Sequence, residues 1–135
     1  MKYWFYIIVG ILLILIDQLS KWWAEVHHFF VIKNSGLIFD WGPKWGTWIF
    51  IFTILVLGLF LFVFETNKKY LLPITLIIAG AVSNLIDRFF RGGIIDFIRI
   101  KGNIATNLAD MYIIVGVIVY IILFYKYENK ISRNK

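Results

Sequence analysis

The chain has 135 residues, of which 61% are apolar and 16% are charged, and its mean hydropathy is +0.81. Soluble domains are about half apolar and about a quarter charged, so this composition excludes a soluble globular protein, a disordered chain and a coiled coil. Cysteine is absent, which excludes disulfides and thiolate chemistry. The net charge is +6, and the lysines and arginines lie at the ends of apolar segments, which is typical of membrane-flanking charge and not of a nucleic-acid-binding patch.

Four segments without Asp, Glu, Lys or Arg predict four membrane-spanning helices, since about 17 to 25 residues cross a bilayer. Pro73 is expected at the start of the third helix, where its missing N–H costs least, and Gly92-Gly93 at its end. The predicted fold class is an all-α membrane protein with one domain over residues 1–135 and a small extracytoplasmic β-hairpin. With interfacial residues added, the helices are placed roughly at residues 3–19, 45–64, 71–90 and 108–125.

An even number of spans places both termini on one side of the membrane, with residues 20–44 and 91–107 on the other side. The 14 lysines and arginines divide equally between the two sides, so the positive-inside rule chooses no orientation. No ionisable residue lies in the middle of a predicted span, where a proton or cation path would need one. Most of the acidic residues lie away from the termini, so any chemistry is expected at that rim of the bundle.

The segment after the first helix predicts a short β-hairpin on the membrane surface. An apolar run from Phe29 to Ile32 precedes turn-forming residues Lys33 to Gly36, and a second apolar run covers Leu37 to Phe39. Residues Ile94 to Ile100 alternate enough to predict another extended segment after the third helix.

The third predicted helix carries a polar stripe near its end. Asn84, Asp87 and Arg88 stand at positions i, i+3 and i+4, so they share one face. Gly80, one turn earlier, allows another helix to approach closely. The residues alone leave two interpretations open: a structural ion pair that joins helices, or part of a functional site.

Two aspartates flank the start of the fourth predicted helix. Asp96 lies among branched apolar residues, where an ionised carboxylate is costly, so we expect it to be protonated or to face a partner. If Asn107 caps the fourth helix, Asp110 is the third residue of that helix, and taken alone it would only complement the helix dipole. Together the two carboxylates could share one proton, as an aspartic protease requires. In that case Asp96 is the protonated acid and Asp110 the ionised base.

Nucleophile and metal chemistry fit the other polar residues less well. His27 and His28 are adjacent, so they cannot share one face as paired metal ligands usually do. Ser20 and Ser83 have no base fixed by sequence spacing. We therefore expect no metal site.

Three rival functions remain to be distinguished. A small four-helix transporter would need an acid in mid-span. A metal-dependent lipid-phosphate transferase would gather Asp87, Asp96 and Asp110 around Mg²⁺, but that class tends to cluster its acids on one helix. A structural protein would require neither Asp96 nor Asp110 beyond their effect on stability.

Five short motifs follow one another along the chain, from Asp17 to about Gly116. They are Asp17-Gln18-Leu19-Ser20-Lys21, Asn34-Ser35-Gly36, Gly80-Ala81-Val82-Ser83-Asn84-Leu85-Ile86-Asp87-Arg88, Ile94-Ile95-Asp96-Phe97-Ile98 and Asn107-Leu108-Ala109-Asp110. In this order on four spans, they resemble the lipoprotein signal peptidases (signal peptidase II), a family of four-helix bacterial membrane aspartyl proteases.

This resemblance implies that Asp96 and Asp110 form the catalytic pair, and that Asp17 and Lys21 support the site from the first helix. The residues that it implies shape the pocket and hold substrate are Asn34, Gly36, Asn84, Asp87, Arg88 and Asn107. The implied reaction removes the signal peptide from a prolipoprotein that carries diacylglycerol on its lipobox cysteine, with cleavage just before that cysteine. No metal or organic cofactor is implied.

The resemblance also implies a bacterial plasma membrane protein with both termini in the cytoplasm and its site near the outer face. We expect a monomer whose partners are the prolipoprotein and membrane lipid, with no nucleic acid. The chain departs from the family in Leu37-Ile38, where small residues are usual, in Ser83, where glycine is usual, and in its short length. A paralogous membrane protease that acts on another modified peptide is therefore kept as an alternative.

Overall fold

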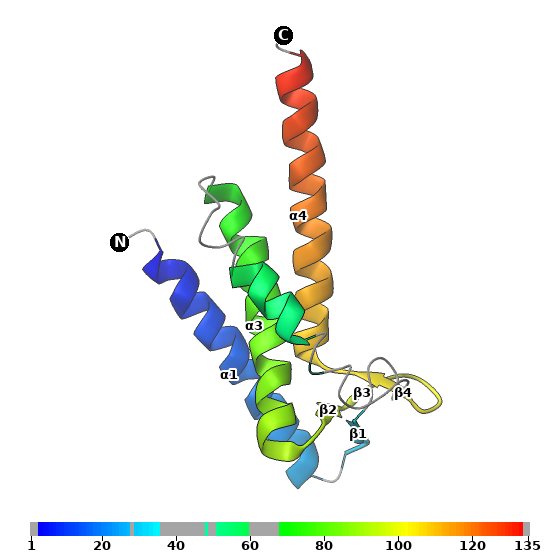
Figure 1. Ribbon diagram of the computed structural model, residues 1–135. Helices are drawn as coiled ribbons and strands as arrows, with labels where there is room; N and C mark the ends of the chain where they lie inside the picture. Colours follow the sequence, from blue (N-terminus) through cyan, green and yellow to red (C-terminus); the bar gives the residue numbers. More distant parts are fainter. Residues whose placement is uncertain (1–2, 28, 36–47, 49–50, 60–67, 134–135) are drawn as a thin grey trace.

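A computed structural model of the chain describes residues 3–27, 29–35, 48, 51–59 and 68–133 (Figure 1). Residues 51–59 are helical and lie within the second predicted span, whose remaining residues, apart from residue 48, are outside the described ones. Gly36 and the second predicted hairpin arm, Leu37 to Phe39, also lie outside the described residues.

Three long helices stand side by side, with α3 between the other two (Figure 1). They are α1 (Trp4–Val26), α3 (Lys68–Arg91) and α4 (Leu108–Arg133). Within the described residues, three helical stretches are long and apolar enough to cross a membrane: Trp4–Val26, Lys68–Arg91 and Leu108–Tyr127. The fold is therefore mostly helical, as the composition predicts.

The central helix is the best buried of the three. Within the most apolar window of α3, 67% of the residues are buried, against 11% for α1 and for α4. Large apolar side chains such as Phe5, Ile114 and Ile118 point away from the bundle and are more than half exposed. Apolar faces of this extent are expected to lie in lipid, because their exposure to water is unfavourable.

The first helix continues past its predicted end at residue 19 and covers Ser20 to Val26. The apolar run stops at Asp17, but Asp17 and Lys21 are both fully buried against the neighbouring helix. Because these charges are neutralised inside the bundle, the helix does not end where the apolar run ends. Residues 20–26, which were expected in the segment between the first two helices, therefore belong to α1.

The third helix begins before Pro73, so the expectation that this proline starts the helix is wrong. Inside a helix, Pro73 offers no N–H to the carbonyl group of Lys69. Its own carbonyl oxygen lies against α4, where an added Cβ at Gly116 would come within 2.7 Å of it. The end of the helix is confirmed: α3 stops at Arg91, and Gly92 follows in the left-handed region with φ +71.

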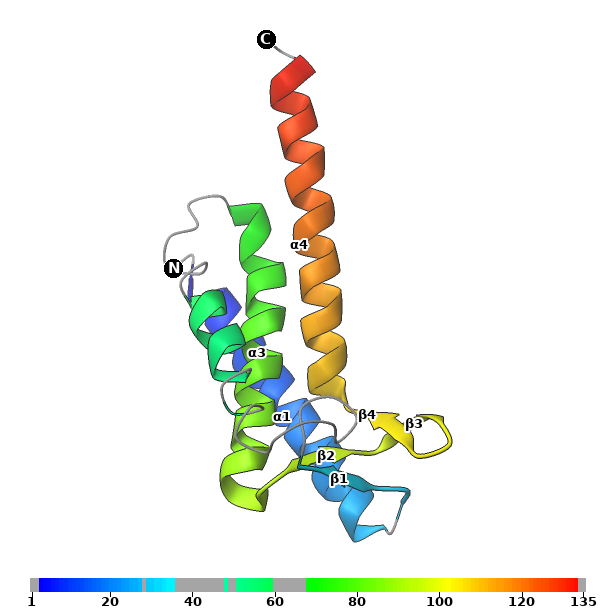
Figure 2. The ribbon, with the colours of Figure 1, turned by 45° about the vertical axis from the view of Figure 1, so that its right-hand side comes forward.

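Four short strands form two antiparallel pairs (Figure 2). In the first pair, β1 (Ile32–Asn34) lies beside β2 (Ile94–Asp96), with Ile32 opposite Asp96. In the second pair, β3 (Ile98–Lys101) and β4 (Ile104–Thr106) form a hairpin that turns at Gly102, with φ +56.

Part of the turn predicted after the first helix is wrong. Lys33 and Asn34, expected in the turn, belong to β1 and pair with Ile95 and Ile94. The strand that pairs with β1 is β2, which follows α3 in the sequence. The extended segment predicted after α3 is confirmed, with an interruption at Phe97.

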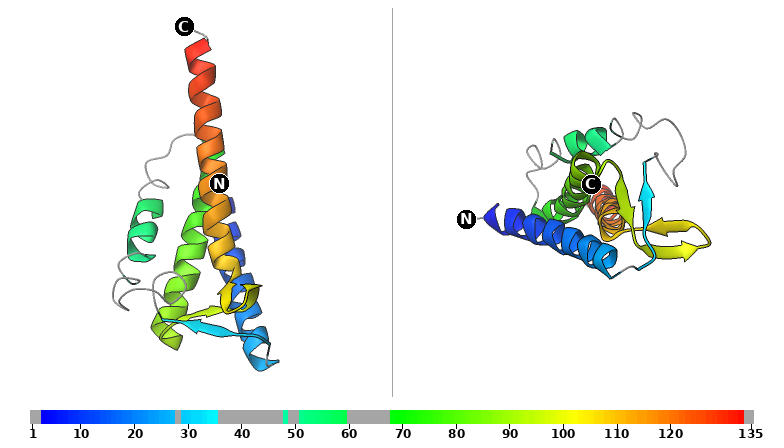
Figure 3. Two further views of the ribbon diagram at one scale, coloured as in Figure 1. Left: turned by 90° about the vertical axis from the view of Figure 1, so that its right-hand side faces the viewer. Right: turned by 90° about the horizontal axis from the view of Figure 1, so that it is seen from below.

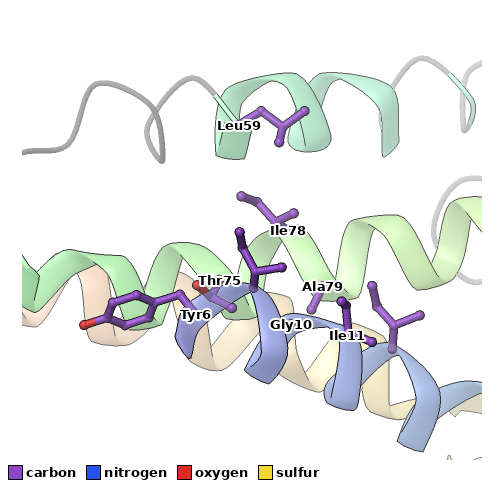
Figure 4. Close-up of a pocket in the computed structure, with 9 residues that line it drawn as sticks. Tyr6, Gly10, Ile11, Leu59, Thr75, Ile78 and Ala79 are labelled. Atoms are coloured by element: carbon purple, nitrogen blue, oxygen red, sulfur yellow. The ribbon is translucent and has the colours of Figure 1, made fainter. Parts of the chain in front are cut away.

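All four strands lie at the end of the bundle opposite to where α1 begins and α4 ends (Figure 3). Along the helices, an apolar cavity of about 220 Å³ lies between α1, α3 and Leu59 (Figure 4). Its lining includes Ile11 and Ile78 and carries no carboxylate, amide or cationic side chain. Neither Asp96, at the end of β2, nor Asp110, in the first turn of the helix α4, lines this cavity.

Candidate functional site

The site forms where four parts of the chain meet. The second half of α1 brings Asp17 and Lys21, and the end of α3 brings Asn84 and Asp87. The strand β2 ends in Asp96, and the first turn of α4 contains Asp110. These residues are far apart in the sequence, and the hydrogen bonds described below join all of them.

Asp96 is 3% exposed and faces two amide groups. Asn107 donates from Nδ2 to Asp96 Oδ1 at 2.6 Å, and Asn34 on β1 donates from Nδ2 to Asp96 Oδ2 at 3.3 Å. The lone carboxylate expected among apolar residues therefore faces partners, and its hydrogen-bond partners are neutral amides rather than a cation.

Burial is the main reason why the pKa of Asp96 is raised to about 7. The negative charge of Asp110 raises it further, while the amide hydrogen bonds from Asn107 and Asn34 and the charge of Lys21 lower it. A carboxyl group with this pKa holds its proton for a large part of the time near neutral pH.

Asp110 accepts hydrogen bonds from two neighbouring elements. Asn84 on α3 donates from Nδ2 to Asp110 Oδ1 at 2.7 Å, and Thr106 donates from Oγ1 to Oδ2 at 3.3 Å. The backbone N–H of Asp110 donates to Asn107 Oδ1 at 2.9 Å, which confirms Asn107 as the helix cap and Asp110 as the third helical residue. All four carboxylate oxygens of Asp96 and Asp110 thus accept a side-chain hydrogen bond, and Asn107 contacts both residues.

Lys21, Asp17 and Asp87 form a buried ionic cluster next to Asn84, the residue that donates to Asp110. The Nζ atom of Lys21 lies 2.6 Å from Asp17 Oδ2 and 2.6 Å from Asp87 Oδ2, and all three side chains are fully buried. Lys21 also donates to Asn84 Oδ1 at 3.3 Å. Asn84 therefore links the cluster to Asp110, since its oxygen faces Lys21 and its nitrogen faces the aspartate.

Asp87 joins three elements. Besides Lys21 on α1, it contacts Arg91 on its own helix and accepts the backbone N–H of Ile95 at 3.3 Å. These contacts match the ion-pair interpretation of the polar stripe. Arg88, the third member of the stripe, is 3% exposed and donates from Nη1 to the carbonyl oxygen of Ser35 at 3.4 Å.

Asp17 connects α1 to the beginning of α4. Its Oδ1 accepts the backbone N–H of Ala109 at 3.0 Å, and its Oδ2 accepts the hydroxyl of Ser83 at 2.6 Å. A carboxylate at a helix N-terminus is favourable, because the free N–H groups and the helix dipole are positive there. Asp17 therefore holds in place the turn that carries Asp110.

Sequence reasoning missed several residues of this network as site residues. Gln18 donates to Asp87 Oδ1 at 2.9 Å and accepts from Arg91 at 2.7 Å. The hydroxyl of Ser83 donates to Asp17, and the hydroxyl of Thr106 donates to Asp110. The i, i+4 spacing of Asp87 and Arg91 on one helix was a usable signal for that pair. Nothing in the sequence pointed to Thr106.

Metal ligands do not gather in the part of the chain that the structure describes: no group of three or more His, Asp or Glu side chains there could hold an ion. His27 lies at the end of α1, with Nδ1 2.9 Å from the carbonyl oxygen of Trp23 and its ring beside the Trp23 ring. His28 lies outside the described residues.

The chain matches known proteins over most of its length. A family model described as "Signal peptidase (SPase) II" matches residues 9–126. The lipoprotein signal peptidase of Clostridioides difficile is 34% identical, with 93% of this chain and 97% of that protein covered. The lipoprotein signal peptidase of Rickettsia conorii is 32% identical, with 91% of this chain and 74% of that protein covered.

Two solved structures, each described as a bacterial membrane enzyme, have a similar fold. One has a TM-score of 0.77 at 24% identity and covers 90% of this chain and 87% of its own. The other has a TM-score of 0.73 at 26% identity and covers 89% and 92%. With the family match and the relatives aligned along nearly the whole chain, this protein belongs to the signal peptidase II family, and it is a membrane protease.

Proposed function

We propose that this protein is an aspartic endopeptidase that removes the signal peptide from diacylglyceryl-modified prolipoproteins, cutting just before the lipidated cysteine. The observation that carries the proposal is the pairing of Asp96 and Asp110 through Asn107, with all four carboxylate oxygens accepting side-chain hydrogen bonds. The name shared by the relatives supports the substrate class.

In the proposed reaction, the two aspartates hold one proton between them and flank a water molecule. Ionised Asp110 takes a proton from the water, and the water oxygen attacks the scissile carbonyl carbon. Protonated Asp96 donates its proton to the carbonyl oxygen. Asp110 then passes its proton to the leaving nitrogen as the C–N bond of the tetrahedral intermediate breaks, and Asp96 takes back the proton from the former carbonyl oxygen, which restores the starting state of the pair. The raised pKa of Asp96 supports its role as the acid.

The neighbouring residues have distinct proposed roles. Asn34, Asn84 and Asn107 orient the carboxylates, because each donates an amide N–H to one of them. Asp17 and Lys21 support the site through the buried ionic cluster. We assign Gly36, Asp87 and Arg88, with the three asparagines, to shaping the pocket and holding the substrate.

The proposed topology has four spans, with residues 45–64 as the second, both termini in the cytoplasm and the aspartates near the outer face of the bacterial plasma membrane. The strands lie at the opposite end of the bundle from the start of α1 and the end of α4 (Figure 1), and Asp96 ends β2 while Asp110 lies in the first turn of α4, which supports this arrangement. A lipidated peptide has its acyl chains in the bilayer and its cleavage site at the interface, so its protease needs polar catalysts at the rim. We propose a monomer surrounded by lipid, with no metal or organic cofactor.

The test is cleavage of a synthetic prolipoprotein by the purified protein in detergent, with products identified by mass spectrometry. The matched control is the same peptide without diacylglycerol. We expect a single cut before the cysteine of the lipidated peptide only, and unchanged turnover in the presence of a chelator. Cleavage of a different modified peptide alone would identify the paralogous protease, and loss of activity with the chelator would point to metal-dependent chemistry.

A further inference from the structure

We infer that Ser83 is a positioning residue: its hydroxyl holds the Asp17 carboxylate in the orientation that sets the first turn of α4, and thereby the place of Asp110. This inference rests on the function proposed above.

The Ser83 hydroxyl is fully buried between α1 and α3. Its Oγ donates to Asp17 Oδ2 at 2.6 Å and accepts a hydrogen bond from Gln18 Nε2 at 2.9 Å. The donated and the accepted hydrogen bond both face α1, since the two partners are consecutive residues of that helix. One small side chain of α3 thus holds two polar side chains of α1.

The other oxygen of Asp17 reaches α4. Its Oδ1 accepts the backbone N–H of Ala109 at 3.0 Å, and the next residue is Asp110. Ser83 is itself followed by Asn84, which donates to Asp110 Oδ1 at 2.7 Å. Two consecutive residues of α3 therefore act on Asp110, one directly and one through Asp17.

The hydroxyl adds a direction that the lysine alone does not supply. Lys21 also contacts Asp17 Oδ2, at 2.6 Å, but its ammonium is shared with Asp87 and Asn84, whereas the Ser83 hydroxyl donates to Asp17 alone. The short Ser83 side chain projects from a helix backbone and fixes which carboxylate oxygen faces α3. The opposite oxygen is then left to face the N-terminus of α4.

The experiment compares Ser83→Ala with the wild type in cleavage of the lipidated prolipoprotein. We expect kcat to fall about tenfold, the equivalent of one lost hydrogen bond to a charged group, with KM unchanged. The matched control is Thr75→Val, which removes another buried hydroxyl of α3, one that donates to the carbonyl oxygen of Leu71 at 2.8 Å. We expect this control to change kcat by less than about twofold.

A double-variant cycle separates positioning from general destabilisation. If Ser83 acts through Asp17, adding Ser83→Ala to Asp17→Asn should lower kcat no further, whereas independent effects would multiply. If Asp17→Asn does not fold, the comparison of Ser83→Ala with Thr75→Val decides, because only the Ser83 hydroxyl donates to Asp17 and equal kcat in these two variants would overturn the inference. Normal kcat in Ser83→Ala, or multiplying losses in the cycle, would overturn the inference while leaving the protease function intact. A wild type that cleaves nothing would instead overturn the function on which the inference rests.

Discussion

Asn107 Nδ2 lies 2.6 Å from Asp96 Oδ1 and joins the first residue before α4 to the last residue of β2. The same side chain caps α4 through its oxygen, which accepts the N–H of Asp110 at 2.9 Å. A capping residue ordinarily serves its own helix. Asn107 also contacts Asp96, so the relative position of Asp96 and Asp110 depends on the residue that caps α4.

The first prediction concerns the two aspartates. Asp96→Asn and Asp110→Asn should each fold and each lower turnover of the lipidated prolipoprotein by at least about 10³-fold, since loss of a general acid or base commonly costs about 10² to 10⁴. Circular dichroism in detergent serves as the folding control. Turnover close to the wild-type rate in either variant would remove that residue from the proposed pair.

The second prediction concerns pH. Because protonated Asp96 is the proposed acid and its pKa is about 7, kcat/KM should fall as pH rises through that value. The Asn34 hydrogen bond favours the ionised form and lowers this pKa, so Asn34→Ala should move the fall in rate to higher pH. Asn103→Ala, in the exposed turn of the β3–β4 hairpin, is the control and should leave the profile unchanged. A shift to lower pH in Asn34→Ala would contradict the assignment.

The third prediction concerns the buried ionic cluster. Lys21→Met leaves Asp17 and Asp87 without the ammonium that contacts both at 2.6 Å, and should reduce the free energy of unfolding by about 3 to 5 kcal/mol. Denaturant titration in mixed micelles measures this loss. Lys101→Met on the exposed β3 strand should unfold like the wild type. Equal stability of the two variants would show that the cluster contributes little.

The fourth prediction concerns the contact between α3 and α4. A Cβ added at Gly80 would collide with the carbonyl oxygen of Ala109, so Gly80→Ala should cost about 1 to 3 kcal/mol and lower turnover by displacing Asp110. Gly10→Ala is the control, because its Cβ would lie 3.4 Å from Thr75 Cγ2 and fits with little movement. Thermal unfolding and turnover are measured on both variants. An unaffected Gly80→Ala would mean that the two helices separate easily.

Features that depend on neighbouring residues could be predicted from the amino-acid sequence. Apolar runs predicted the three long helices of the described residues, Gly92 the end of α3, and Asn107 the cap of α4, because hydropathy, backbone conformation and capping depend on nearby residues. The motifs also selected Asp96 and Asp110 as candidates. Their chemistry could be proposed before any coordinates, since few residue types can share a proton.

The pairing of residues that are distant in the sequence could be seen only in the folded protein. The local sequence pattern predicted a turn at Lys33 and Asn34, whereas both residues belong to β1, which pairs with β2. The same kind of pattern ended the first helix too early, because it could not show that Lys21 on α1 forms an ion pair with Asp87 on α3. The amides around the aspartates likewise come from β1, α3 and the start of α4. Such contacts depend on the three-dimensional path of the chain, because a buried polar group is stabilised by whichever partner folding brings to it.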